Sequence, residues 1–149
     1  MKRYSPYIYV VIFAMLYGCA TVPLTTPSLD AEGKKFNTEQ GKANIYVQRS
    51  GGIFGGPVLI FQLMLDGRFV GAIAPDTYHL LSVQPGEYTI AVMGTGSYEQ
   101  VKLKVEQGKN YFCKVVFAIG PLAYIESISE EEGKKLVLES MRAETTNYK

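Results

Sequence analysis

Short apolar or alternating runs, separated by turn residues, fill the chain from residue 43 onward. Alternation of apolar and polar residues is typical of a strand with one buried face. Within residues 99–107, for example, Val101, Leu103 and Val105 alternate with lysines. The pattern predicts seven or eight strands at roughly 8–12-residue spacing, as in a β-sandwich or barrel. The expected strands are 43–49, 58–65, 68–73, 78–84, 87–93, 99–107, 111–119 and 123–128.

Two dipeptides between these runs predict specific turns. Asp66-Gly67 follows one run directly and precedes the next, which favours a two-residue hairpin of type I′ with positive φ at both positions. Pro85-Gly86 fits a type II turn, with proline at the second position and glycine where φ is positive. Both turns indicate hairpins in an antiparallel fold.

The pattern changes after residue 128. Ser129 followed by Glu132 matches a capping box, and acidic residues in a first helical turn interact favourably with the helix dipole. We therefore expect one C-terminal helix over residues 130–143, with Leu136, Val137 and Met141 facing the sheet. Gly133 lies inside it and costs about 1 kcal/mol relative to alanine.

Residues 20–42 show no apolar periodicity and are rich in Pro, Thr, Ser, Gly and Lys. Such a composition is typical of a flexible tether. The alternative is an N-terminal segment that wraps around the domain, with Phe36 as the large apolar residue available to pin it.

The N-terminus has the organisation of a signal peptide. Lys2 and Arg3 form a short positive region, and Tyr7 to Tyr17 is an uncharged run of the size of a signal-peptide core. A membrane-spanning helix needs about 20 apolar residues, and Pro23 and Pro27 interrupt the uncharged stretch that continues to Leu29. The alternative is a retained signal anchor, which would hold the domain at the inner membrane.

The end of that run, Leu16-Tyr17-Gly18-Cys19, resembles a bacterial lipobox. In such a motif the cysteine thiol takes a diacylglycerol group, and the signal peptidase cuts between Gly18 and Cys19. Two or three acyl chains on one cysteine give a stable membrane anchor. Ala20 and Thr21, without an aspartate, resemble an outer-membrane sorting context. The expected division is a signal peptide (1–18), a lipidated tether (19–42) and a domain (43–149).

Composition narrows the class of protein. The chain has 149 residues and a formal net charge of +1, and removing residues 1–18 leaves 13 basic and 14 acidic residues. This balance gives no electrostatic basis for nucleic-acid binding. If Cys19 carries lipid, Cys113 is the only other cysteine, so no intramolecular disulfide is expected.

Four segments carry a family resemblance: ANIYVQRSGG, LDGRFVGAI, YHLLSVQPGEYTIAV and EQGKNYFCKV. Together they resemble an uncharacterised family of small bacterial lipoproteins that carry a domain of unknown function. The resemblance covers about residues 43–128. The Asp-Gly and Pro-Gly turns are also similar to PEGA-type β-sandwich modules. The resemblance implies a prealbumin-like antiparallel sandwich and a lipid anchor. It implies no activity and no catalytic residue, because the shared positions are turn and core residues.

Candidate chemistry in the chain is sparse. His79, the only histidine, is expected on a strand as a solvent-facing or structurally bonded residue, because no nucleophile or metal-ligand pattern accompanies it. Cys113 is expected in the core, where an apolar environment raises the thiol pKa. Glu130–Glu132 are interpreted as helix capping rather than as calcium ligands. We expect no cofactor and no metal.

Two surface features each have two interpretations. The segment GGIFGGP (51–57) places Ile53 and Phe54 between glycines, either as an apolar tip that contacts a partner or membrane, or as a hairpin loop folded back on the sheet. Tyrosines on the expected strands either stack on sugars in a surface groove or face the core with their hydroxyls at its rim.

The residues therefore predict a lipid-anchored protein of the bacterial outer membrane with its domain in the periplasm. We expect a non-enzymatic role in binding a protein partner of the envelope. The second hypothesis is a binding module for cell-wall glycan or a small ligand, and the third is a hydrolase. A hydrolase would require His79 to meet an acid and a nucleophile in one cleft.

Overall fold

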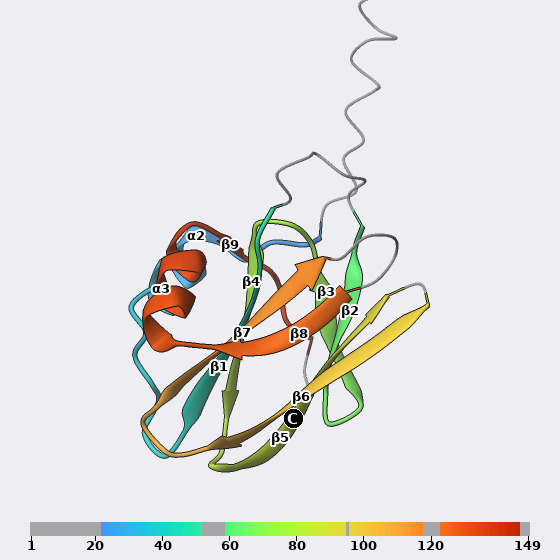
Figure 1. The fold of residues 1–149 in the computed structure, drawn as a ribbon. Coiled ribbons are helices and arrows are strands. Elements are labelled where there is room, and N and C mark those ends of the chain that lie inside the picture. Colours follow the sequence, from blue (N-terminus) through green and yellow to red (C-terminus); the bar gives the residue numbers. More distant parts are fainter. Residues whose placement is uncertain (1–21, 52–58, 95, 118–122, 147–149) are drawn as a thin grey trace, which may run out of the picture.

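The computed structural model describes residues 22–51, 59–94, 96–117 and 123–146. Two β-sheets pack face to face, with helices on the outer side of one of them (Figure 1). The elements, in chain order, are α2 (Pro27–Gly33), β1 (Ala43–Arg49), β2 (Phe61–Leu65), β3 (Arg68–Ile73), β4 (Thr77–Val83), β5 (Gly86–Gly94), β6 (Ser97–Val105), β7 (Asn110–Phe117), β8 (Ala123–Ile128), α3 (Glu130–Leu138) and β9 (Met141–Arg142).

The predicted mainly β sandwich with one C-terminal helix is confirmed. One sheet has the order β8-β7-β1-β4-β9 and the other has the order β3-β2-β5-β6. Most neighbouring strands are antiparallel, as expected, but β1 pairs with β7 and β4 pairs with β9 in parallel. These parallel pairs join segments far apart in the chain, which a local pattern does not reveal.

The main core lies between the two sheets. Alternate residues of each strand point into it, including Ile45 of β1, Leu63 of β2 and Ile90 of β5, all of which are fully buried. This is the alternation that the sequence predicted, and burial of these aliphatic side chains is the main favourable contribution to folding.

A second core lies on the outer side of the five-stranded sheet, under the helices. Tyr46 of β1, Tyr78 of β4, Phe112 of β7 and Val137 of α3 form it, and Phe36 packs against them. Because both faces of the sheet are covered, every residue of β1 is buried. The molecule therefore has three layers. The sequence predicted the two sheets and a C-terminal helix that packs on them, but not the contribution of α2 to the helical layer.

The two predicted turns have different outcomes. Asp66 and Gly67 have φ values of 48° and 77°, which confirms the type I′ hairpin between β2 and β3. The type II turn predicted at Pro85-Gly86 is wrong, because the φ of Gly86 is not positive. Here the chain passes from one sheet to the other, and Gly86 starts β5 by pairing with Val105.

The C-terminal helix is shorter than the predicted 130–143. Ser129 caps its N-terminus by accepting from the Glu132 amide at 3.2 Å, as expected. The helix ends at Leu138, and the Met141 amide then donates to the Asp76 carbonyl at 2.9 Å to start β9. Val137 is buried as predicted, whereas Met141 is 54% exposed and does not face the sheet.

Residues 22–42 pack against the domain, so the predicted flexible tether is wrong for this segment and the wrapping alternative is right. Val22 is buried, α2 covers part of the outer core, and Phe36 lies 5.4 Å from Tyr46 between ring centroids. Thr26 caps α2, whose first residue is a proline, a combination that favours helix initiation. The short helix was missed because its seven residues carry too little periodicity.

Candidate functional site: a groove at the open edge of β4

The two long sides of the sandwich differ. On one side β6 and β8 lie next to each other, and the Ala123 amide donates to Ser97 Oγ at 3.4 Å. On the other side β9 pairs with β4 only at Thr77 and Tyr78. In the part of the chain that the structure describes, no further strand continues this ladder toward Val83. The C-terminal segment covers β4 as far as His79, since the Ala143 amide donates to the Tyr78 carbonyl and Thr145 Oγ1 contacts His79 Nδ1. The β4 edge from Leu80 to Val83 borders a groove.

The groove consists of two adjoining hollows of about 540 and 600 Å³, which share Lys42 and Ser82 in their lining. The first lies between α2 and the outer face of β4, beside Leu80 and Arg142. The second lies between the Asp66-Gly67 hairpin and the end of β4. Both volumes are in the usual range of ligand-binding clefts. We call the two hollows together the β4-edge groove.

The lining of the β4-edge groove is mixed in charge. Lys42 and Arg68 contribute positive charge, and Glu39 and Asp66 contribute negative charge. Lys42 forms an ion pair with Glu39, and Asp66 Oδ1 accepts from the Thr89 amide at 2.8 Å. The lining suits a polar, roughly neutral segment with backbone groups to satisfy, rather than a highly charged ligand.

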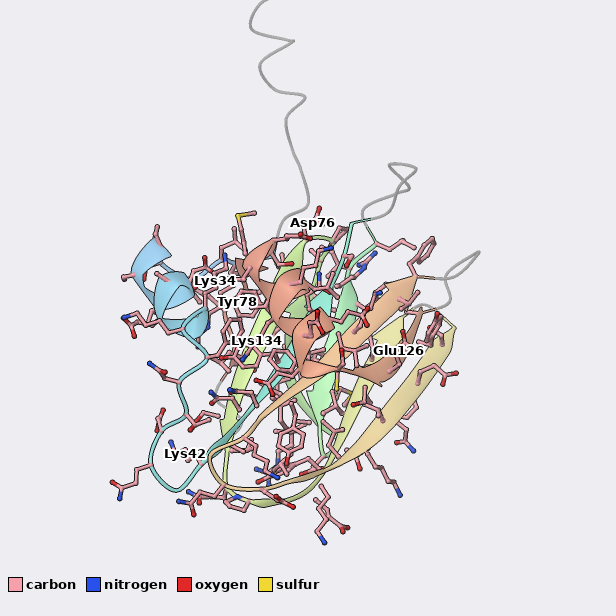
Figure 2. The ribbon with its side chains drawn as sticks, turned by 60° about the vertical axis from the view of Figure 1, so that its left-hand side comes forward. Lys34, Lys42, Asp76, Tyr78, Glu126 and Lys134 are labelled. Carbon is pink, nitrogen blue, oxygen red and sulfur yellow. The ribbon has the colours of Figure 1, made fainter. Side chains whose placement is uncertain are left out.

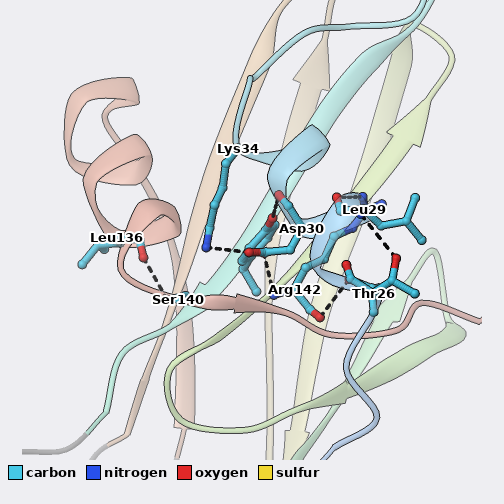
Figure 3. A network of polar contacts seen from close by, with 9 residues as sticks. Thr26, Leu29, Asp30, Lys34, Leu136, Ser140 and Arg142 are labelled. Atoms are coloured by element: carbon cyan, nitrogen blue, oxygen red, sulfur yellow. Dashed lines mark hydrogen bonds and ion pairs between the residues drawn. The ribbon is translucent and has the colours of Figure 1, made fainter.

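One wall of the groove is α2, which a polar network fixes to β9 (Figure 3). Asp30 accepts from Lys34 Nζ at 2.8 Å and from the Arg142 amide at 3.0 Å. Arg142 Nη1 donates to the Leu29 carbonyl at 2.9 Å, and the Thr25 amide donates to the Arg142 carbonyl at 2.9 Å. The wall is thus held by contacts between residues more than 110 positions apart.

Two buried tyrosines of the five-stranded sheet hold α2 in place. Tyr46 donates to the Gly33 carbonyl at 2.9 Å, and Tyr78 donates to the Asp30 carbonyl at 3.2 Å. Burial raises the pKa of Tyr46 to about 12 and also raises the pKa of Tyr78. Both hydroxyls therefore stay protonated and act as hydrogen-bond donors to helix α2.

His79 is structurally bonded, one of the two interpretations that the sequence favoured. It is fully buried on β4, with Nε2 2.9 Å from the Ala72 carbonyl and Nδ1 3.2 Å from Thr145 Oγ1. Because a carbonyl only accepts, Nε2 carries the proton and Nδ1 accepts from Thr145. Burial lowers the pKa of His79. The ring is a neutral link between β3, β4 and the C-terminal segment.

Cys113 lies in the main core, as predicted. Its side chain is fully buried on β7 between the two sheets. Desolvation raises the pKa of the thiol to about 12, so the reactive thiolate is strongly disfavoured.

Two of the tyrosines are buried and offer no surface on which a sugar could stack. Tyr46 and Tyr78 are buried, but in the outer core rather than between the sheets as expected. Tyr98 and Tyr124 are 53% and 42% exposed, and no ring contact joins them among the described residues.

Sequence reasoning assigned no role to Arg49, whose side chain lies at the end of β1 and is only 4% exposed. Its Nη1 donates to the Leu59 carbonyl and, at 3.4 Å, to the Ile73 carbonyl. The guanidinium lies 4.5 Å from the ring centroid of Phe61. Desolvation lowers the pKa of Arg49, and Asp76 opposes this effect. The side chain joins β1 to the opposite sheet.

Several predicted site residues lie outside the described residues: Gly18 and Cys19 at the lipobox, and Ile53 and Phe54 in the 51–57 segment. Sequence reasoning missed the β4-edge groove. Its residues come from α2, the 37–42 segment, the strands β1 to β5, β9 and the C-terminal segment, and no local pattern brings them together.

In the described ranges, no group of three or more His, Cys, Asp or Glu residues is arranged to hold a metal ion. None of the helices in those ranges has the length and apolar character needed to span a membrane.

The chain matches one family model and one related protein. A family model described as a protein of unknown function, DUF2846, matches residues 39–127, which span nearly all of the two sheets from β1 to β8. An uncharacterized protein of Haemophilus influenzae strain Rd is 34% identical over 127 residues, covering 83% of this chain and 74% of that protein. The family match leaves α2, α3 and β9 outside its limits.

Proposed function

The chain belongs to the DUF2846 family of proteins of unknown function, and from that premise we propose that it is a lipid-anchored envelope protein that binds a protein partner without catalysing a reaction. The anchor is the diacylglycerol-modified Cys19, and the location is the outer membrane of a two-membrane bacterium, with the domain in the periplasm. The partner binds in the β4-edge groove.

Support for the anchor comes from the residues themselves. Lys2 and Arg3, the uncharged run from Tyr7 to Tyr17 and the Gly18-Cys19 junction occur in the order that a lipoprotein signal peptide requires. Two or three acyl chains hold a protein on a membrane far more firmly than one chain does.

The observation that carries the binding role is the incomplete ladder on β4. β9 pairs with β4 only at Thr77 and Tyr78, and among the described residues the segment that follows it bonds no further along β4 than His79. The edge from Leu80 to Val83 therefore borders a groove of suitable volume. An exposed strand edge binds extended peptides by adding a strand, with backbone hydrogen bonds providing affinity and side-chain pockets providing specificity. The mixed charge beside Lys42 and Glu39 fits a polar peptide.

Two observations support a non-enzymatic role. The imidazole of His79 is buried, and both of its nitrogens are engaged in hydrogen bonds. The thiol of Cys113 is buried and has a raised pKa. Neither group is placed to touch a substrate, which a general base or a nucleophile must do. The glycan alternative loses support because Tyr46 and Tyr78 are buried.

Intact-mass analysis of the membrane-fraction protein tests the anchor. We expect a chain that starts at Cys19 and carries diacylglycerol and acyl mass, and we expect the Cys19→Ser variant to lack that mass. A chain that retains residues 1–18 would instead establish a signal anchor and an inner-membrane location.

Site-specific photocrosslinking in cells tests the groove. A photoreactive amino acid replaces Leu80 or Arg68, which line the two hollows. As an exposed control it replaces Gln100 of β6, at the other edge of the four-stranded sheet from Arg68. We expect Leu80 and Arg68 to yield the same protein adduct and Gln100 to yield none. The charge reversal Lys42→Glu is expected to weaken that adduct. Equal adducts from all three positions would refute the groove as the binding site.

A further inference from the structure

We propose that the end of the sandwich that carries Val22, Leu24 and Met141 lies directly on the membrane surface, with the far end of the β4-edge groove pointing away from it. This proposal rests on the lipidation of Cys19 given above. The occupant of this apolar end is therefore a lipid surface. The inference concerns where the domain sits and which way it faces.

The first step is that the chain is fixed to the domain from Val22 onward. The Val22 side chain is 6% exposed and packs with Ala74 and Ala143. Leu24 forms a β-bridge with Ala143, and the Glu144 amide donates to the Pro23 carbonyl at 2.8 Å. Residues 22–25 thus form an integral part of this end of the fold.

The second step is the length of chain that remains. Only Ala20 and Thr21 separate Cys19 from Val22. A fully extended chain covers at most about 3.6 Å per residue, so the Cα atoms of Cys19 and Val22 are at most about 11 Å apart. The tether expected over residues 20–42 would have allowed a reach several times longer. The short link keeps Val22 close to the lipid head groups.

The third step is the chemistry of this end. Leu24 is 39% exposed, Met141 is 54% exposed and Leu138, at the end of α3, is 56% exposed. The Met141 amide donates to the Asp76 carbonyl at 2.9 Å, which places β9 at the β3–β4 turn beside Val22 and Ala74. Apolar side chains at this end favour contact with the interfacial region of a bilayer.

Charge at this end gives a further constraint. Asp76 and Glu139 are exposed there. Acidic side chains gain nothing from a negatively charged lipid surface, so attraction to anionic lipid does not drive the contact. Docking is therefore expected to depend on the anchor and the apolar side chains and to be insensitive to the content of anionic lipid.

The groove runs away from this end. β4 starts at Thr77, next to Asp76, and ends at Val83 beside the second hollow. Seven strand residues cover about 20 Å. Figure 2 shows Asp76 and Lys42 at opposite ends of the molecule. The hollow between Lys42, Arg68 and Tyr88 is thus open to the aqueous compartment, where a partner has access.

Lipid-quenching fluorescence on the full-length processed protein tests the orientation. A fluorophore is attached to Met141→Cys, and to Glu87→Cys at the start of β5 as an exposed control at the opposite end. The buried Cys113 thiol stays unlabelled. The protein is reconstituted into phosphatidylcholine vesicles containing a doxyl-labelled quencher lipid, with and without phosphatidylglycerol. We expect at least threefold stronger quenching at position 141 than at position 87 in both lipid mixtures.

Equal quenching at the two positions, or stronger quenching at position 87, would overturn the orientation. Intact mass of the same samples keeps this failure separate from that of the anchor. Lipidated protein with equal quenching refutes the orientation alone. An unprocessed, membrane-bound chain refutes the lipid anchor, and the same quenching ratio then still decides the orientation. Protein that does not associate with the vesicles refutes both.

A matched variant tests the cause. Twenty Gly and Ser residues inserted between Thr21 and Val22 restore a long flexible tether without changing the domain. We expect the quenching ratio between positions 141 and 87 to fall at least twofold. An unchanged ratio would overturn the short link as the reason for the orientation.

Discussion

At the scale of single residues, two glycines are explained by the side chains that pack against them. A Cβ at Gly133 would lie 2.2 Å from Phe112 Cγ, and a Cβ at Gly71 would lie 2.4 Å from His79 Cε1. Real Cβ atoms do not approach so closely. The absence of a side chain therefore lets α3 rest on the aromatic ring of β7 and lets β3 pass the buried imidazole.

Gly133→Ala is expected to destabilise the fold. In an exposed helix the same change gains about 1 kcal/mol, but here the methyl group overpacks the Phe112 contact at a cost of about 1–3 kcal/mol. Urea unfolding followed by circular dichroism measures the difference. The control is Glu131→Ala, at an exposed position of the same helix. A Gly133→Ala variant more stable than wild type would contradict the close packing.

His79 makes stability depend on pH. Burial lowers its pKa below the ordinary value of 6.5, so the unfolded chain binds the proton more readily than the folded chain does. The free energy of unfolding should therefore decrease as pH falls below about 6.5, and the decrease should end below the pKa of the folded state. Urea unfolding between pH 7.5 and 5.5 tests this, with His79→Gln expected to flatten the dependence.

Because His79 is the only histidine, its ring protons give a single set of NMR signals to titrate. An imidazole in the folded protein that titrates at or above pH 6.5 would refute the buried, neutral ring. Arg142, whose charge also lowers this pKa, is the neighbouring group to keep unchanged in these variants.

At the scale of elements, the segment from Val22 to Lys42 behaves as part of the domain rather than as a linker. Phe36 has a φ of 58° and contacts Tyr46 and Phe112, and Lys134 Nζ lies 5.4 Å from its ring centroid. The Phe36 carbonyl accepts from Asn110 Nδ2 at 2.8 Å. The ring and the carbonyl of Phe36 thus hold the end of the segment, in addition to the contacts of Val22 and Asp30 nearer its start.

Phe36→Ala is expected to release this segment. Loss of the partly buried ring should cost about 2 kcal/mol and increase hydrogen exchange across α2. Exchange measured by mass spectrometry, together with trypsin cleavage at Lys34 and Lys35, reports on the local release. Leu29→Ala, which removes a half-exposed side chain from the same helix, is the control. Rapid exchange of α2 in the wild-type protein would restore the tether interpretation.

At the scale of the whole molecule, the N-terminal and C-terminal segments close one part of the side between β3 and β4, next to Val70, Tyr78 and His79. The Thr146 amide donates to the Val70 carbonyl at 2.9 Å, and the Ala143 amide donates to the Tyr78 carbonyl at 2.9 Å. The segment after β9 therefore lies between β3 and β4. Residues 22–25 pack against this segment, so the two ends stabilise each other.

Deletion of residues 141–149 is expected to cost several kcal/mol, at about 1 kcal/mol for each lost hydrogen bond. It should also raise the pKa of His79 toward 6.5, because the ring loses Thr145 and much of its cover. The deletion also uncovers the β4 edge from Thr77 to His79, and the longer exposed edge should promote dimerisation, which light scattering detects. Deletion of residues 147–149 is the control. A monomer of unchanged stability would refute a closing role for this segment.

Local sequence determined the elements whose physics is local. The exact limits of the strands 43–49, 68–73 and 123–128, the type I′ turn at Asp66-Gly67 and the Ser129 cap all follow from side-chain alternation, backbone preferences or a contact three residues away. The burial of Cys113 also follows from alternation. The lipobox at Cys19 is likewise a local pattern, and it remains a prediction.

Only the tertiary structure decided the rest. The parallel pairing of β1 with β7, the docking of α2 through Arg142 and the groove beside β4 all depend on contacts between distant segments. The change of sheet at Pro85-Gly86 and the end of α3 at Leu138 have the same origin, since their partners, Val105 and Asp76, lie far away in the chain. A local pattern states which face of a segment is apolar, but the surface that covers that face is chosen by packing.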